Sequence, residues 1–233
     1  MNFGRAFSYI TEDQQWLQKV GLAALIMIIP ILGPITVIGW ALEITRRIIK
    51  GEPETPLPDW NNFGDYVVKG LQVFVIGFVY ALPVILISIC QQSFAVLPSL
   101  MKDNAQAIQT ITTVVGIVGL CFGCFTFLYE LVLAFVLPAA LGNFAATGQL
   151  SAGFRFSEVF GLLRAAPGPY FMAFLGYILA SIIASLGLIA CIIGVLFTAA
   201  YAYTIDASLW GQAYNAAKAA QNAAPVVPAA PAM

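Results

Sequence analysis

The sequence predicts an all-α integral membrane protein, a helical bundle with about five transmembrane helices and two amphipathic helices at the membrane interface. Of its 233 residues, 61% are hydrophobic and 9% are charged, whereas a soluble domain has about 45–50% apolar residues. The mean hydropathy is +0.89. Long uncharged runs alternate with short polar segments, which is the pattern of a chain that crosses a bilayer several times.

The uncharged runs cover residues 20–42, 70–89, 111–141 and 170–205. A helix needs about 20 apolar residues to cross the hydrocarbon core. The last run is too long for one upright crossing, since as a single helix it would extend roughly 54 Å against a core of about 30 Å. It is therefore either one tilted helix, giving four crossings in all, or two short crossings that turn near residues 185–187.

Charge distribution favours five crossings over four. With five, Lys218 joins the basic residues of the loops at 43–69 and 143–167, and the bias that marks cytoplasmic loops becomes sharper. Both loops are then cytoplasmic in a multi-pass protein of the cell (inner) membrane. Residues 1–19 form an N-terminal interfacial segment, 20–212 the transmembrane helical domain, and 213–233 an Ala/Pro-rich tail.

Three stretches at the ends of apolar runs resemble one another. They read "GWALEITRRIIKGE" from Gly39, "PAALGNFAATGQL" from Pro138 and "AYTIDASLWGQAY" from Ala202. Each passes from an apolar helix through a half-polar segment to Gly followed by Glu or Gln. This similarity predicts that the chain consists of two divergent copies of one unit plus a closing helix.

An amphipathic segment follows each of the first two stretches. "LPDWNNFGDYVVKGL" places Trp60 and Phe63 on one helical face, and "FRFSEVFGLLR" places Phe156 and Phe160 on another. Such segments are typical of helices that lie in the membrane interface and lead into a crossing.

The charged stretch that begins "RRIIKGEPETPLPD" is predicted to be a cytoplasmic connector. Its basic residues Arg46, Arg47 and Lys50 are attracted by anionic headgroups, and Glu43 precedes the two arginines at helical pairing distance. Asp59 is predicted to cap the next helix. The candidates for docking on the membrane interface or on a partner are Arg46, Arg47, Lys50, Trp60, Phe63, Phe156 and Phe160.

The composition argues against an enzyme. The chain has no histidine, which removes the usual general base and metal ligand, and it has no phosphate-binding glycine loop. We expect no catalytic residue, no metal and no cofactor. The sequence contains no basic face of the kind that binds nucleic acid, so no nucleic-acid partner is expected.

One acid and three glycines stand out in the third run. Glu130, next to Tyr129, lies well inside a predicted crossing, where an ionisable group is costly and suggests a proton or cation site. The alternative is that Glu130 lies near the interface or is held protonated by a hydrogen bond. Gly116, Gly119 and Gly123 are predicted to allow a close helix–helix contact.

The same stretches carry a family resemblance. The series "PILGPITVIGWALEITRRIIKGEPETPLPDWNNFGDYVVKGL", "LPAALGNFAATGQLSAGFRFSEVF" and "LWGQAY" resembles the domain-of-unknown-function 4013 family of prokaryotic polytopic membrane proteins. The similarity extends from about Phe7 to Tyr214. The resemblance implies a fold and a location but no chemistry.

These observations predict a non-enzymatic accessory, assembly or membrane-organising component. Its partners would be the lipid bilayer and other membrane proteins, or a second copy of itself. The alternative is a small-solute or ion transporter that uses Glu130 and a first helix broken at "IIPILGP".

Overall fold

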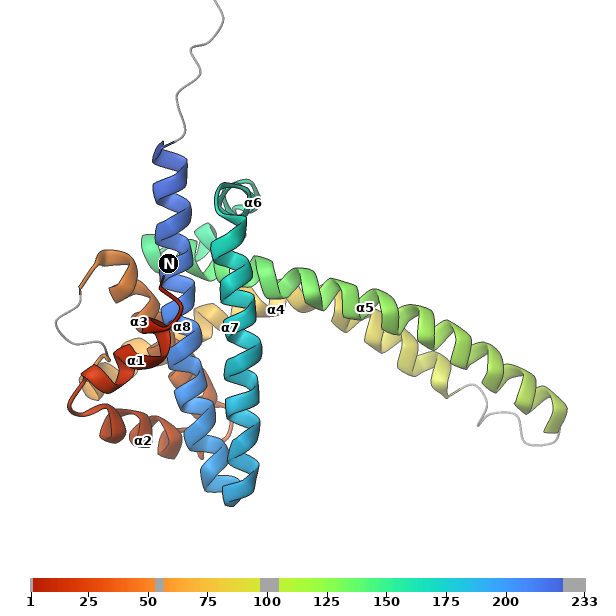
Figure 1. The fold of residues 1–233 in the computed structure, drawn as a ribbon. Coiled ribbons are helices and arrows are strands. Elements are labelled where there is room, and N and C mark those ends of the chain that lie inside the picture. Colours follow the sequence, from red (N-terminus) through yellow and green to blue (C-terminus); the bar gives the residue numbers. More distant parts are fainter. Residues whose placement is uncertain (1, 53–56, 97–104, 224–233) are drawn as a thin grey trace, which may run out of the picture. The chain divides into compact units, whose positions relative to one another are not determined.

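The computed structural model describes residues 2–52, 57–96 and 105–223, and every regular element in these ranges is helical. The chain forms two compact units, which we call the body (residues 1–76 and 135–233) and the hairpin (residues 77–134). Figure 1 shows the α-helices, which are α1 (Arg5–Glu12), α2 (Trp16–Ile26), α3 (Leu32–Lys50), α4 (Phe63–Ala95), α5 (Ala105–Thr147), α6 (Phe156–Ala165), α7 (Pro167–Leu186) and α8 (Cys191–Ala223). Short 3₁₀ helices are η1 (Trp60–Asn62), η3 (Leu150–Phe154) and η4 (Gly187–Ala190).

The uncharged run at residues 20–42 is not one continuous helix, and the break predicted at "IIPILGP" lies within it. The run is divided between α2 and α3, because Pro30 has no N–H to continue the helix and Ile31 adopts a positive φ of 67°. Gly33 then allows α3 to start against the end of α2. A Cβ at Gly33 would lie 2.1 Å from the Ile26 carbonyl oxygen.

The turn predicted near residues 185–187 is confirmed. α7 ends at Leu186, η4 follows, and α8 begins at Cys191. The Thr198 hydroxyl in α8 donates a hydrogen bond to the Ala184 carbonyl oxygen at 3.0 Å. α7 and α8 therefore run side by side as an antiparallel pair (Figure 1).

α8 is the central helix of the body, where it contacts α1, α2, α3, α6 and α7. Small residues in α8 allow these helices to pack closely against it. Its buried apolar side chains are Ala200, Ala202, Ile205, Ala207, Leu209, Ala213, Tyr214 and Ala217. The helix continues to Ala223, so the stretch "SLWGQAY" is helix interior rather than a helix end, and residues 213–223 of the predicted tail belong to α8.

Glycines bring α3 into backbone contact with two neighbours. A Cβ at Gly39 would lie 1.9 Å from the Tyr66 carbonyl oxygen of α4, and one at Gly70 would lie 1.9 Å from the Ile35 oxygen of α3. On another side, a Cβ at Gly211 would lie 2.8 Å from a methyl carbon of Ile48. α3 is thus held tightly between α4 and α8.

The two predicted interfacial helices differ in the structure. The segment after "LPDW" forms only the turn η1 and then continues without interruption as α4. α6 is a separate helix that lies across α7 in Figure 1. Its side chains Val159 and Leu162 are buried against other parts of the body, whereas Phe156 and Phe160 are exposed.

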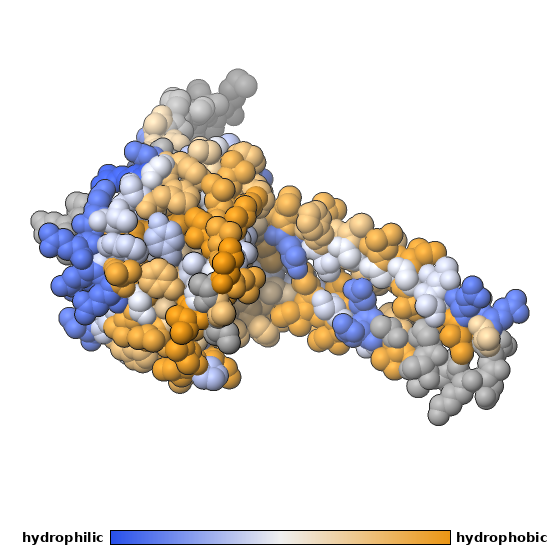
Figure 2. Space-filling view, turned by 60° about the horizontal axis from the view of Figure 1, so that its bottom comes forward, coloured by the Kyte–Doolittle hydropathy of each residue, from blue (hydrophilic) through white to orange (hydrophobic). Residues whose placement is uncertain are grey.

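The hairpin consists of the second part of α4 and the first part of α5. The Tyr129 hydroxyl of α5 donates a hydrogen bond to the Tyr80 carbonyl oxygen of α4 at 2.9 Å. Many large apolar side chains point outward, among them Leu86, Ile117, Leu120, Phe127 and Leu128, each about 60% exposed or more. Figure 2 shows the resulting hydrophobic surface.

Among the described residues, three helices are long and apolar enough to cross a membrane: Trp60–Phe94, Ile108–Thr147 and Pro167–Ile189. They contain the predicted runs 70–89 and 111–141 and the first part of the last run. The number of crossings, five or four, stays a prediction.

Replacing Gly39 by Ala should destabilise the body, because the new methyl group would collide with the α4 backbone at Tyr66. Forcing packed helices apart costs about 1–3 kcal/mol. Thermal unfolding in detergent, followed by tryptophan fluorescence, should show a lower Tm. Gly64→Ala is the control, since among the described residues a Cβ there would meet no packing neighbour within 4 Å. Equal Tm values for the two variants would contradict the close contact of α3 and α4.

Candidate functional sites around the charged end of α3

The charged end of α3 is the main polar region of the body. The Glu43 carboxylate accepts a hydrogen bond from Lys69 Nζ of α4 at 2.6 Å and lies 3.3 Å from Arg46 Nη1 and 3.9 Å from Arg47 Nε. Lys69 also contacts Asp65 at 2.6 Å. The predicted pairing of Glu43 with both arginines is confirmed, and Lys69 adds a link between α3 and α4.

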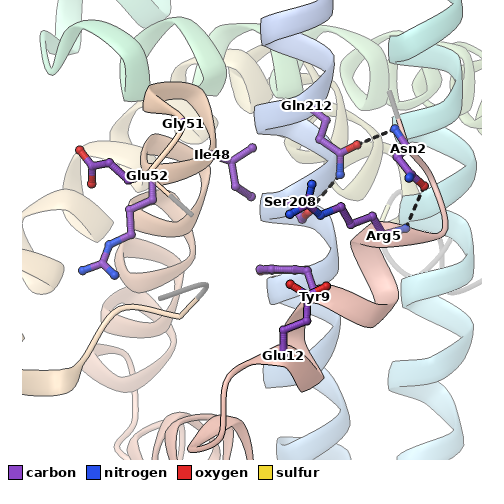
Figure 3. Close-up of a pocket in the computed structure, with 10 residues that line it drawn as sticks. Asn2, Arg5, Tyr9, Glu12, Ile48, Gly51, Glu52, Ser208 and Gln212 are labelled. Carbon is purple, nitrogen blue, oxygen red and sulfur yellow. Dashed lines mark hydrogen bonds between the residues drawn. The ribbon is translucent and has the colours of Figure 1, made fainter. Parts of the chain in front are cut away.

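Two polar cavities lie on different sides of this end. The first, the α1 cavity, has a volume of about 250 Å³ and is lined by Asn2, Arg5, Tyr9, Glu12, Arg47, Ile48, Gly51, Glu52, Ser208 and Gln212. In Figure 3, residues of the N-terminal segment and α8 face Ile48 and Glu52 across it. The backbone N–H of Asn2 donates to Gln212 Oε1 at 2.9 Å, so the cavity rim holds the N-terminal segment on α8.

The second, the α5 cavity, has a volume of about 430 Å³. It lies between α3, the start of α4 and the end of α5. Its lining residues are Leu42, Glu43, Arg46, Lys50, Asp65, Lys69, Gln72, Phe144, Ala145, Ala146, Thr147 and Gly148. The two loops predicted at 43–69 and 143–167 therefore meet at one cavity.

A buried lysine forms a separate polar cluster. Lys19 Nζ donates to Asp13 Oδ2 at 2.8 Å and to the Leu57 carbonyl oxygen at 2.9 Å, and lies 2.9 Å from Asp59 Oδ1. These three acceptors match the three protons of the ammonium group. The Asp59 side chain does not accept the predicted capping hydrogen bond, because this carboxylate pairs with Lys19 instead.

The two buried groups of this cluster, Asp13 and Lys19, each favour the charged form of the other. Burial would raise the pKa of Asp13, but hydrogen bonds from Lys19 and the Gln15 N–H outweigh it and lower this pKa. Burial would lower the pKa of Lys19, but Asp13 and Asp59 outweigh it and raise this pKa. The stabilisation from Asp13 is lost as the pH falls through its lowered pKa, and that from Lys19 as the pH rises through its raised pKa.

Aromatic rings fix the "LPDW" turn beside this cluster. The indole rings of Trp40 and Trp60 stack with centroids 5.1 Å apart. Trp40 Nε1 donates to the Pro58 carbonyl oxygen at 2.9 Å, and Trp60 Nε1 donates to the Lys19 carbonyl oxygen at 3.0 Å. Trp60, predicted to face the membrane interface or a partner, is therefore half-buried and joins α2, α3 and the turn.

A third polar cluster connects α5 to α6. Asn143 Nδ2 donates to Glu158 Oε2 at 2.9 Å and to the Ala152 carbonyl oxygen at 3.0 Å. Arg155 Nη1 donates to Glu158 Oε1 at 3.2 Å. The hydrogen bond from Asn143, with Arg155 beside it, lowers the pKa of Glu158. Gly148 and Gly51 both have a φ near 70° just after their helices, which gives the ends of α5 and α3 a similar shape.

The remaining predicted site residues lie on exposed surfaces. Phe63, Phe156 and Phe160 are 42–52% exposed. In the hairpin, Gly119 faces Gln91 of α4, where a Cβ would lie 3.4 Å from the amide nitrogen. A Cβ at Gly116 or Gly123 would meet no packing neighbour within 4 Å among the residues that the structure describes. Glu130 is exposed, although its neighbour Tyr129 faces α4.

The buried acid of the last helix is Asp206, which is not among the site residues predicted from the sequence. It is 7% exposed, and its Oδ1 has no hydrogen-bond partner among the described residues. Its helical spacing to the buried residues Ala202, Leu209 and Ala213 is the signal that could have indicated burial. Within the described ranges, no group of three or more Cys, Asp or Glu side chains is arranged to hold a metal ion.

An all-helical chain whose described residues include three helices long and apolar enough to cross a membrane has the features of a polytopic membrane protein. Residues 22–193 match the family model described as "Protein of unknown function (DUF4013)". The chain belongs to this family, which confirms the resemblance predicted from its sequence. No curated protein and no solved structure matches the chain.

Replacing Lys19 by Met should strongly destabilise the body, because Asp13 would remain buried without its cation. Breaking a buried pair in this way costs about 3–5 kcal/mol. The Tm in detergent measures the effect, and adding Asp13→Asn to Lys19→Met should recover part of it. Arg155→Met, which breaks an exposed pair, is the control and should cost less than about 1 kcal/mol. Similar losses for Lys19→Met and Arg155→Met would refute a structural role of the Lys19 cluster.

Proposed function

We propose that this protein is a non-enzymatic accessory, assembly or membrane-organising component of a membrane complex. In this proposal the body anchors the protein at the membrane interface, and the hairpin presents a helix surface to a partner membrane protein.

The position of Glu130 carries the proposal. Gly116, Gly123 and Glu130 follow one another at intervals of seven residues, so they lie on one side of α5. Within the described part of the chain, a Cβ at either glycine would meet no packing neighbour within 4 Å, and Glu130 is exposed. A carboxyl group on an apolar helix in lipid costs about 2.5–3.5 kcal/mol. A partner helix that packs on the two glycines would cover Glu130 and supply a polar neighbour.

The exposed aromatic residues of α6 support docking at the interface. Phe156 and Phe160 are exposed beside the charged residues Arg155 and Glu158, which is the arrangement of a helix lying at the level of the headgroups. The meeting of residues 43–69 and 143–167 at the α5 cavity supports placing both loops on the same side, which we propose to be cytoplasmic.

The second candidate is a small-solute or ion transporter. The break between α2 and α3 favours it, since interrupted helices line the substrate sites of many transporters. In this alternative Glu130 binds the proton or cation, and the interrupted segment around Pro30 provides backbone groups for the solute.

Native protein purified in mild detergent should carry a stoichiometric set of membrane proteins, identified by mass spectrometry. Gly116→Leu combined with Gly123→Leu should remove that set, because the added side chains block close helix packing. Cys121→Leu adds bulk to another side of α5 and should leave the set intact. A monomer or a homo-oligomer without other proteins would overturn the accessory role.

Replacing Glu130 by Gln separates the two candidates. Gln keeps the hydrogen-bonding groups but not the titratable proton, so an accessory protein should retain its partners and the Tm of the wild type. If the protein is a transporter, its uptake rate in liposomes should fall at least tenfold, because the substitution would remove its proton or cation site. Loss of solute or ion uptake in Glu130→Gln proteoliposomes would favour transport over the accessory role.

A further inference from the structure

The α5 cavity combines features of a site for one lipid headgroup. Its volume of about 430 Å³ is within the usual range of ligand sites, about 300–1,000 Å³. α3 contributes Arg46 and Lys50, and α4 contributes Lys69 and Gln72. The third wall is the end of α5, at Phe144 to Gly148.

The charges in the lining leave a positive excess. Three cations, Arg46, Lys50 and Lys69, face two carboxylates, Glu43 and Asp65. Both carboxylates contact Lys69 at 2.6 Å. Among the described residues, no carboxylate lies within ion-pair distance of Lys50, which ends α3. Lys50 is therefore the cation available to an added anion, with the partly exposed Arg46 one turn away.

The end of α5 offers the opposite polarity. The carbonyl groups in the last turn of a helix have no partner within the helix, and Ala145, Ala146 and Thr147 in the last turn of α5 line the cavity. A bound molecule that fits both walls needs an anionic group for Lys50 and hydroxyl or ammonium donors for these carbonyls.

Apolar side chains lie next to the cavity on α4. Val68, Leu71 and Val75 are 42–54% exposed, and they flank Lys69 and Gln72 on the same helix. They belong to the candidate span Trp60–Phe94. Acyl chains attached to a headgroup in the cavity would find this apolar surface directly beside it.

We infer that the α5 cavity binds the headgroup of an anionic glycerophospholipid of the phosphatidylglycerol class. Its phosphate accepts hydrogen bonds from Lys50 and Arg46, its glycerol hydroxyls donate to the carbonyls at the end of α5, and its single negative charge balances the excess cation. The inference needs the membrane location but not the accessory role, so a failed co-purification would leave it standing.

Native mass spectrometry of the full chain in detergent tests this with dioleoyl-phosphatidylglycerol, -phosphatidylethanolamine and -phosphatidylcholine. We expect phosphatidylglycerol to bind at least fivefold more tightly than the other two. Lys50→Gln should weaken this binding about fivefold, as expected for one cation near a membrane surface. Arg5→Gln removes the same charge from the lining of the α1 cavity and should change nothing.

Equal binding of the three lipids, or equal effects of Lys50→Gln and Arg5→Gln, would overturn the inference. A soluble competitor identifies the source of the phosphate. Glycerol phosphate at millimolar concentration should fail to displace the lipid, because it lacks acyl chains for the α4 surface. Displacement by glycerol phosphate would assign the cavity to a soluble phosphate ester and overturn the lipid assignment. The Tm of Lys50→Gln checks that this variant remains folded.

Discussion

The close contact of α3 with its two neighbours is the constraint on which the body depends. Gly39 and Gly70 let the backbones of α3 and α4 touch, and Gly211 does the same for α3 and α8. In a membrane, helix association relies on such packing and on interhelical hydrogen bonds rather than on the hydrophobic effect. Thr45 adds one of these bonds, since its hydroxyl donates to the Ala207 carbonyl oxygen at 3.0 Å.

This packing brings the charged end of α3 against α4 and α5, where the polar groups satisfy one another. Glu43 holds Lys69 across the helix contact, and Asn143 holds Glu158 at the start of α6. Such pairs hold the connecting segments in place. The excess positive charge in the α5 cavity is the feature that internal pairing does not explain, and a bound anionic headgroup would account for it.

The hairpin is packed differently from the body. Its helices contact each other through Tyr129 and Tyr80 and expose most of their apolar side chains. Apolar side chains that point outward are compatible with contact to lipid, whereas an exposed carboxyl group at Glu130 is costly there. The combination of two open glycines and an acid on one side of α5 is what directs the proposed function toward a helical partner.

The sequence by itself determined the helical class, the apolar runs and the pairing of Glu43 with Arg46 and Arg47, because these depend on neighbours within a few residues. It offered the turn near residues 185–187 as one of two alternatives. Only the tertiary structure decided the rest. Lys19 pairs with Asp59, which lies 40 positions further along the chain, Asp206 is buried by other helices, and the α5 cavity forms where three helix ends meet. Periodicity and charge counts carry no information about which distant segments pack together, so these sites could not be read from the chain alone.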